Sequence, residues 1–311
     1  MIESKLRGAN SGFMGGVFAT PYSFTSTGRR GAFGPNASEL QAFYSATQYG
    51  LVTSVGDGYQ RIVIDVDGVY QFQVRSASGE INTQVFRAGR SGEITASFSL
   101  SAGTHVVMAV GQLGNSQNQG SGGGGASYIY TSAALLMVVG GGGGYHPNHT
   151  TTGPSTDSQS SQSGGLGFGT SANTRSSGGS GGFGQNNNSY GSFSGGGGVG
   201  GGWLTEGSIN NAFPYAHGAS LSGGGVGGSF NGNPSRSTTN TAGYGGGGAF
   251  TNTYGGGGGG YSGGHGSYNG PHAGGGGGSI VDSSGTVIAA HSVIGSYTSH
   301  TEGFITVTQI A

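Results

Sequence analysis

Alternation of apolar and polar residues in the first third of the chain predicts β-strands. In the stretch VYQFQVR, Tyr70, Phe72 and Val74 alternate with polar residues, and residues 94–100 repeat this pattern. A period of two is typical of strands with one buried face. Residues 106–110 are apolar throughout, which is typical of a strand buried on both faces. Turn-forming residues separate these stretches, so we predict a sandwich of antiparallel sheets.

Strand patterns return near the end of the chain. Residues 280–282 and 286–290 flank the sequence SSG, a hairpin-like break, and the closing stretch GFITVTQI predicts a last strand. We expect this last strand to pair with the N-terminal strands, which makes the glycine-rich region between them a long insertion in one sandwich. The one helix that the pattern supports covers residues 39–45, with Asn36 or Ser38 as its N-cap.

Glycine is concentrated between these two β regions. The chain has 76 glycines among 311 residues, and many of them form runs of three or more, at 122–125, 140–144, 195–198, 200–202, 223–225, 245–248, 255–260 and 274–278. A flexible Gly/Ser linker is the usual interpretation of such text. However, the runs are bordered by apolar and aromatic residues, as in LLMVVGGGGG. This context favours an ordered structure over loose loops.

A bundle of extended helices with polyproline II geometry is the ordered structure that we expect for these runs. Such a helix has three residues per turn and no internal hydrogen bonds, so its N–H and C=O groups must pair with neighbouring segments. Only glycine allows close lateral packing, because a Cβ would push the neighbours apart. The predicted fold is therefore mainly β, an antiparallel β-sandwich with an inserted bundle of polyglycine helices and very little α-helix.

Composition and charge exclude several classes of protein. With 32% hydrophobic residues and a net charge of −1, the chain lacks the signature of disorder. Lys5 is the only lysine and the arginines are scattered, so we expect no nucleic-acid partner. The absence of cysteine excludes disulfides and thiolate metal sites. The longest apolar run, residues 133–139, is far shorter than the ~20 residues of a membrane span, and the first residues show no apolar signal region.

The residues that could carry metal or catalytic chemistry are sparse. His146 and His149 lie three apart and His265 and His272 flank a glycine-rich stretch, but no acidic residue accompanies either pair. Zinc sites need three or four protein ligands, so we interpret these as exposed loop histidines. Glu206 is the only glutamate of the glycine-rich region, and glycoside hydrolysis needs a pair of carboxylates. We expect no enzyme, no metal and no cofactor.

Seven stretches of the chain form an ordered set of motifs: residues 24–35, 68–79, 110–114, 122–128, 135–144, 274–279 and 303–307. In the same order, they resemble the glycine-rich domain of the anaplastic lymphoma kinase and leukocyte tyrosine kinase receptors and of many bacterial and viral glycine-rich proteins. The resemblance covers residues 22–310 and implies a β-sandwich with polyglycine helices beside it. The chain lacks the cysteines, kinase and membrane span of the receptors, so receptor signalling is not implied.

The glycine runs also resemble those of the distal adhesins on bacteriophage tail fibres, in which loops joining glycine helices contact the host surface. The stretch GFMGGVFATP near the start is similar to phage fibre proteins as well. Assembly in the cytosol followed by lysis would account for an extracellular type of domain that has no cysteine and no visible signal sequence.

Aromatic residues in polar connectors are the candidates for recognition. Loops rich in Tyr, Ser, Gly and Asn are typical of binding surfaces, and the connectors 146–163, 185–194 and 207–217 have this composition. The alternative is that the rings lie on the glycine segments and form their core. The candidate receptor-contact residues are Tyr145, His146, His149, Tyr190, Phe193, Trp203, Phe213, Tyr215 and His217.

These observations predict residues 1–21 as an attachment segment and residues 22–311 as a single domain. Within it, residues 22–139 and 279–311 would form the sandwich, and residues 120–278 the bundle and its loops. The first hypothesis is a non-enzymatic virion protein, a phage tail-fibre adhesin that binds a host receptor, protein or glycan, and joins other virion proteins through its N-terminal segment. The alternative is a self-assembling subunit of an extracellular filament or coat, and a homo-oligomer is among the expected assemblies.

Overall fold

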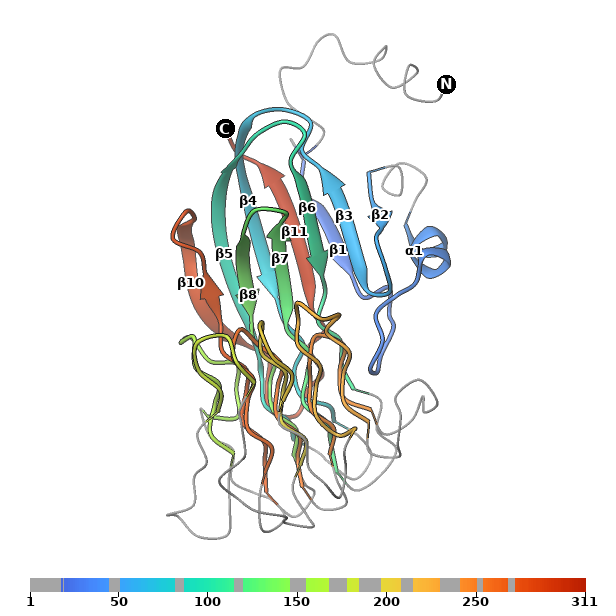
Figure 1. Cartoon of the computed structure of the whole chain (residues 1–311), viewed down its shortest axis with the longest axis vertical. Coiled ribbons are helices and arrows are strands. Elements are labelled where there is room, and N and C mark those ends of the chain that lie inside the picture. Colours follow the sequence, from blue (N-terminus) through green and yellow to red (C-terminus); the bar gives the residue numbers. More distant parts are fainter. Residues whose placement is uncertain are drawn as a thin grey trace.

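The fold consists of two antiparallel sheets with a set of glycine-rich segments extending from one end of them (Figure 1). It is seen in a computed structural model. The residues that the structure describes are 18, 20–44, 51–81, 87–114, 120–145, 155–167, 178–184, 197–207, 215–229, 241–250, 254–267 and 272–311. The prediction of a mainly β fold is confirmed.

The first sheet has five strands in the order β1-β11-β4-β5-β10, and all neighbours are antiparallel. Its strands are β1 (Tyr22–Thr25), β4 (Gly68–Arg75), β5 (Ser91–Leu100), β10 (Thr286–Ile294) and β11 (Phe304–Gln309). As expected, the closing strand β11 pairs with the N-terminal strands, lying between β1 and β4. The glycine-rich region therefore lies, along the chain, between strands of the same pair of sheets.

The second sheet has six strands in the order β2-β3-β6-β7-β8-β9, again antiparallel. Its strands are β2 (Thr53–Ser54), β3 (Tyr59–Val63), β6 (His105–Ala109), β7 (Ser127–Thr131), β8 (Leu135–Val139) and β9 (Ile280–Val281). One expectation is corrected here: β9 and β10 flank the SSG turn but belong to different sheets, so they form no hairpin. The turn carries the chain from one layer to the other.

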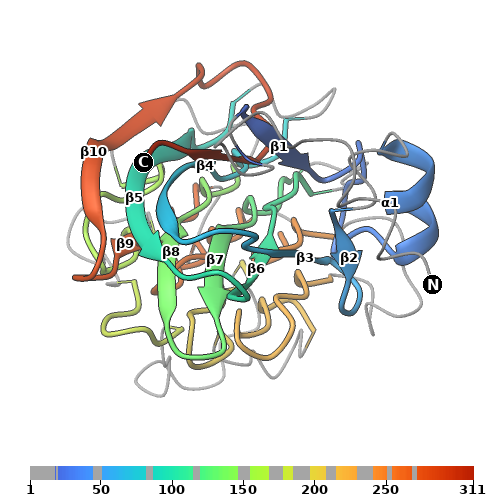
Figure 2. The ribbon, with the colours of Figure 1, turned by 90° about the horizontal axis from the view of Figure 1, so that it is seen from above.

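The hydrophobic core lies between the two sheets, which Figure 2 shows as two layers from above. Tyr70, Phe72 and Val74 of β4 are fully buried, as their alternation predicts. They share one cluster with Met108 and Val106 of the opposite sheet. A buried aromatic or aliphatic side chain of this size contributes about 1.5–3 kcal/mol through removal from water. An apolar core of the usual kind therefore stabilises the sandwich.

The helix α1 (Ala37–Phe43) begins two residues before the predicted start. Asn36, one of the two expected caps, is the N-cap: its side chain accepts a hydrogen bond from the Glu39 N–H, 3.0 Å away. The Glu39 carboxylate in turn accepts from the Asn36 N–H at 2.8 Å. These two bonds form a capping box, which satisfies backbone donors that a helix end leaves unpaired.

The glycine segments lie side by side and bind one another through their backbones. We call residues 120–126, 140–145, 197–202, 243–250, 255–267 and 273–279 the glycine bundle. In residues 255–261, successive N–H groups donate to three different segments, and every third donor returns to the same one. The acceptors are the carbonyls of His272, Gly275 and Gly278, then of Ser121 and Gly124, then of Gly198 and Gly201, at 2.8–3.2 Å. The bundle is thus cross-linked in three directions.

Close packing explains why these positions are glycine. A Cβ on Gly258 would overlap the carbonyl oxygen of Gly141, and one on Gly142 would overlap that of Gly89, each well under 3.0 Å. Most other glycines of the bundle meet neighbouring backbone in the same way. The runs of the bundle therefore pack against one another in the described residues and are no loose linkers. The run 223–225 differs from the expectation: it lies in a turn, where Gly224 has a φ of +118° and nothing within 4 Å of an added Cβ. The runs of the bundle carry no regular helix or strand, so their predicted polyglycine-helix conformation stays a prediction.

Candidate functional site

From here on, a connector is any stretch that joins two described segments of the glycine-rich region. Residues that border several connectors meet at the end of the glycine bundle that lies away from the sheets (Figure 1). The Gly255 N–H donates to the His272 carbonyl at 3.1 Å, and the Ser267 N–H donates to the Gly255 carbonyl at 2.9 Å. The Gly197 N–H donates to the Ser267 carbonyl, also at 2.9 Å. Three described segments, 197–207, 254–267 and 272–311, are thus fixed beside one another where they border connectors.

Further borders join the same end. The Ser121 N–H donates to the Tyr145 carbonyl at 2.9 Å, and Ser229 forms a β-bridge with Thr241. We call this end the distal end, defined by the residues that border the connectors there: Gly114, Gly120, Tyr145, Gly167, Gly197, Tyr215, Ser229, Thr241, Phe250, Tyr254, Ser267 and His272. Loops that a rigid scaffold holds together at one end are a common location of binding residues.

The predicted contact residues that are described do not form one cluster. Tyr215 borders the distal end and is 46% exposed, so its ring is available to a partner. Tyr145 is fully buried, and its hydroxyl bonds the Thr156 hydroxyl at 2.9 Å. A side chain without exposed surface cannot contact a receptor, so Tyr145 is a core residue of the bundle and the prediction for it is corrected.

Trp203 and His217 lie elsewhere. The Trp203 ring packs edge-on against Tyr128 and Tyr130 of β7, at 5.8 and 5.7 Å between centroids. It therefore covers the outer face of a sheet, at the other end of the bundle from Tyr215. The His217 imidazole is largely buried, with Nε2 3.4 Å from the exposed carboxylate of Glu206. The remaining candidates, His146, His149, Tyr190, Phe193 and Phe213, lie outside the described residues.

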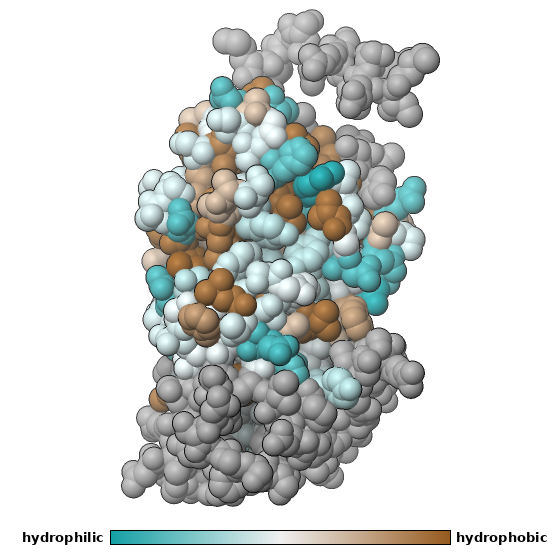
Figure 3. Space-filling model, viewed as in Figure 1, coloured by the Kyte–Doolittle hydropathy of each residue, from teal (hydrophilic) through white to brown (hydrophobic). Residues whose placement is uncertain are grey.

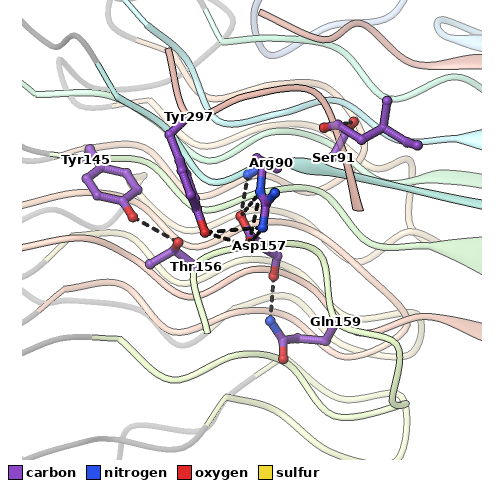
Figure 4. Close-up of polar contacts among 8 residues, drawn as sticks. Arg90, Ser91, Tyr145, Thr156, Asp157, Gln159 and Tyr297 are labelled. Carbon is purple, nitrogen blue, oxygen red and sulfur yellow. Dashed lines mark hydrogen bonds and ion pairs between the residues drawn. The ribbon is translucent and has the colours of Figure 1, made fainter. Parts of the chain in front are cut away.

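An ion pair with a buried carboxylate, which the sequence reasoning missed, joins the 155–167 segment to the sandwich (Figure 4). Asp157, only 2% exposed, accepts from the Arg90 side chain at 2.9 Å, from the Arg90 N–H at 2.8 Å and from the Tyr297 hydroxyl at 3.0 Å. The guanidinium also lies 4.5 Å from the Tyr297 ring centroid, a cation–π contact. The hydrogen bond that the Arg90 side chain donates to Asp157 is the main cause that raises the pKa of Arg90.

Three separate parts of the chain meet in this cluster. Arg90 directly precedes β5, Asp157 belongs to the 155–167 segment, and Tyr297 follows β10. A buried carboxylate is tolerated only when it is paired and hydrogen-bonded, and here every contact is supplied by the other two elements. A lone charge in an otherwise neutral region was the sequence signal that could have indicated Asp157.

The bundle's interior is neutral. The expectation of an exposed loop histidine is wrong for His265, which is buried. Its Nδ1 contacts the Gly266 carbonyl, and burial lowers its pKa to about 4. Within the described residues, no three His, Asp or Glu side chains gather closely enough to hold a metal ion. Nor does that part of the chain contain a helix of the length and apolarity needed to cross a membrane.

Comparison with known proteins adds no assignment to these observations. The sequence matches no model of a known protein family, and it matches no curated protein.

Proposed function

We propose that this chain is a non-enzymatic virion protein, a host-attachment adhesin of a phage tail fibre, that contacts its receptor with the distal end of the glycine bundle. The observation that carries the proposal is the gathering of connector borders at one end of a backbone-bonded scaffold. Such a scaffold leaves the connectors free to vary in sequence, because the hydrogen bonds that define the bundle are between backbone groups. The partner would be a cell-surface protein or glycan.

The conformation of the runs as polyglycine helices belongs to the same proposal. Polyproline II helices turn through three residues, so their N–H groups point in three directions and every third one points the same way. The donors of residues 255–261 return to the same neighbour at every third position. This periodicity supports the helical interpretation, although no regular element is assigned to the runs.

An attachment segment would have to end earlier than residue 21. Phe18 is 1% exposed and belongs to the core, where its ring lies 5.4 Å from that of Tyr22 and 6.1 Å from that of Tyr70. A residue packed in this way is part of the sandwich. We therefore propose that contacts to other virion proteins are made by residues that precede Phe18, and that the protein is located in the virion.

Binding of the purified, fluorescently labelled full chain to a panel of bacterial cells tests the proposal. We expect saturable binding to a subset of strains, and loss of that binding in a variant with Tyr190, Phe193 and Tyr215 replaced by serine. The matched control is Phe43→Ser, since Phe43 is 53% exposed but lies on α1, away from the bundle. Binding that survives the triple substitution in a folded variant, or that fails equally in the control, would contradict a contact site at the distal end.

The second candidate is the self-assembling structural subunit. It is favoured by one observation, the exposure of apolar residues along the edge strand β10. Negative-stain electron microscopy of the purified chain separates the two candidates: filaments or sheets would favour the structural subunit, and discrete particles would favour the adhesin.

A further inference from the structure

The two sheets end in four edge strands of very different length. In the described residues, β2 and β9 have two residues each and β1 has four, whereas β10 has nine. The edge strand β2 is also contacted by the helix α1. Short or covered edges are the usual protection against pairing with another chain. Three edges of this molecule have that protection, and β10 does not.

The β10 strand is exposed on both of its faces. Thr286, Val287, Ile288, Ala289 and Ala290 are all exposed in succession, and Val287 and Ile288 are 50% exposed. Figure 2 shows β10 at the rim of its sheet, and in Figure 3 apolar residues gather on the flank where Figure 1 shows β5 and β10. The strand's inner edge pairs with β5. No strand of the described residues pairs with its outer edge.

The strand also lacks the charges that normally protect a free edge. Lysine or another charged residue on an edge strand opposes association, but no Asp, Glu, Lys or Arg occurs from Ser283 to Thr301. The register against β5 shifts between Val287 and Ala289 and again between Ala289 and Ser292. These irregularities increase the local twist. The first of them lies at Ile288, inside the exposed stretch Thr286–Ala290 on which a partner strand would have to pair.

We propose that a second copy of this chain pairs with β10 in antiparallel orientation, with the two-fold axis at Ile288. An unpaired strand edge offers N–H and C=O groups at strand spacing, and an identical antiparallel strand satisfies them symmetrically. This register places Ile288 opposite Ile288 of the second copy, and Val287 opposite its Ala289. Large side chains thus meet small ones on either side of the axis, and no like charges are brought together.

Such pairing makes a closed dimer. Each copy uses the same edge, so the contact is isologous and uses up the only long free edge of the described strands. The two five-stranded sheets would form one continuous sheet across the axis. A filament needs a second, different contact surface, and this inference supplies none. It concerns the sandwich alone and does not depend on the proposed function of the distal end.

The mass of the purified protein in solution is the first test. Light scattering at about 100 μM should give twice the chain mass of 30.4 kDa, and the double variant Val287→Lys/Ile288→Lys should give the single chain mass with an unchanged circular dichroism spectrum. The matched control is Val63→Lys, because Val63 is 46% exposed but lies in β3, inside the other sheet. A wild-type monomer, or a dimer that persists in the lysine double variant, would overturn the proposal.

A single cysteine tests the register. The chain has no cysteine, and residues directly opposite in an antiparallel pair have Cα atoms about 4.5–5.5 Å apart, within the range of a disulfide. Ile288→Cys should therefore form a covalent dimer on mild oxidation, whereas Val63→Cys should remain a single chain on denaturing gels. Equal cross-linking of both variants, or none at Ile288→Cys, would contradict pairing about Ile288.

Discussion

Replacing Gly258 by alanine tests whether the bundle depends on close backbone packing. Gly258 lies in the middle of the 255–260 run, and its N–H donates to the Gly275 carbonyl at 2.9 Å. An added methyl group would overlap the Gly141 carbonyl, and the overlapping atom is backbone that cannot rotate away. The neighbouring segment must therefore move, together with the hydrogen bond that the Gly141 N–H donates to Gly259.

The magnitude follows from three terms. Overpacking of a tightly packed interior costs about 1–3 kcal/mol, and disrupting one buried backbone hydrogen bond costs about 1–3 kcal/mol. Alanine also restricts the unfolded chain, which stabilises the protein by about 0.4–1 kcal/mol. The expected net loss in the free energy of unfolding is about 3 kcal/mol, a large part of the stability of an ordinary domain.

Urea denaturation of wild type and variant measures this loss. The control is Gly103→Ala: Gly103 has a φ of +83° and nothing within 4 Å of an added Cβ, so only the cost of a left-handed alanine applies, about 1–2 kcal/mol. If Gly258→Ala costs no more than this control, the packing argument for the bundle is refuted.

Three further predictions concern the cluster of Arg90, Asp157 and Tyr297, the buried histidine and the helix cap. Asp157→Asn should lower the free energy of unfolding by about 2 kcal/mol, because it leaves Arg90 without its carboxylate. The control Glu206→Gln, at an exposed site, should change it by under about 0.5 kcal/mol. Equal effects of the two substitutions in urea denaturation would contradict a stabilising role of this cluster. The folded-state pKa of His265, about 4 against 6.5, means that the unfolded chain binds the additional proton between these pH values. The free energy of unfolding should therefore decrease as the pH is lowered through this window, by about 2 kcal/mol from pH 7 to pH 5 for His265 alone. A His265→Leu variant with an equally steep pH dependence would show that other groups cause the decrease. Asn36→Ala should lower the free energy of unfolding by about 1 kcal/mol through loss of the cap, which is measured as a lower Tm. The control is Ser38→Ala, because the Ser38 hydroxyl donates to the Asn36 side chain and does not bond the helix backbone.

The strands could be predicted because they obey local rules. The alternation of Tyr70, Phe72 and Val74 fixes which face of β4 is buried, and the structure places all three in the core. The cap of α1 could be predicted for the same reason, since Asn36 and Glu39 are neighbours in sequence. The placement of β9 and β10 in different sheets could not be predicted, because a short turn between two strands does not say whether they share a sheet or connect two layers.

The arrangement of the segments in the bundle depends on long-range pairing that a run of identical glycines does not specify. Every run has the same residue, so nothing in the sequence of residues 255–260 indicates that its donors find segments near residues 121, 198 and 272. The burial of Tyr145 could not be predicted for the same reason, because the residues around it in the sequence resemble those of an exposed connector. Asp157 pairs with Arg90, 67 residues away, and only the fold brings them together.

Amide hydrogen exchange of the glycine runs tests the central claim of this account most directly. The account states that the runs form one backbone-bonded bundle that positions the distal end. It predicts that the amides of Gly141–Gly144 and Gly255–Gly260 exchange as slowly as those of β4 and β5, because each donates to a buried carbonyl of another segment. Exchange of these amides at the rate of an unstructured peptide, beside protected strands, would contradict the bundle and the contact site that it supports.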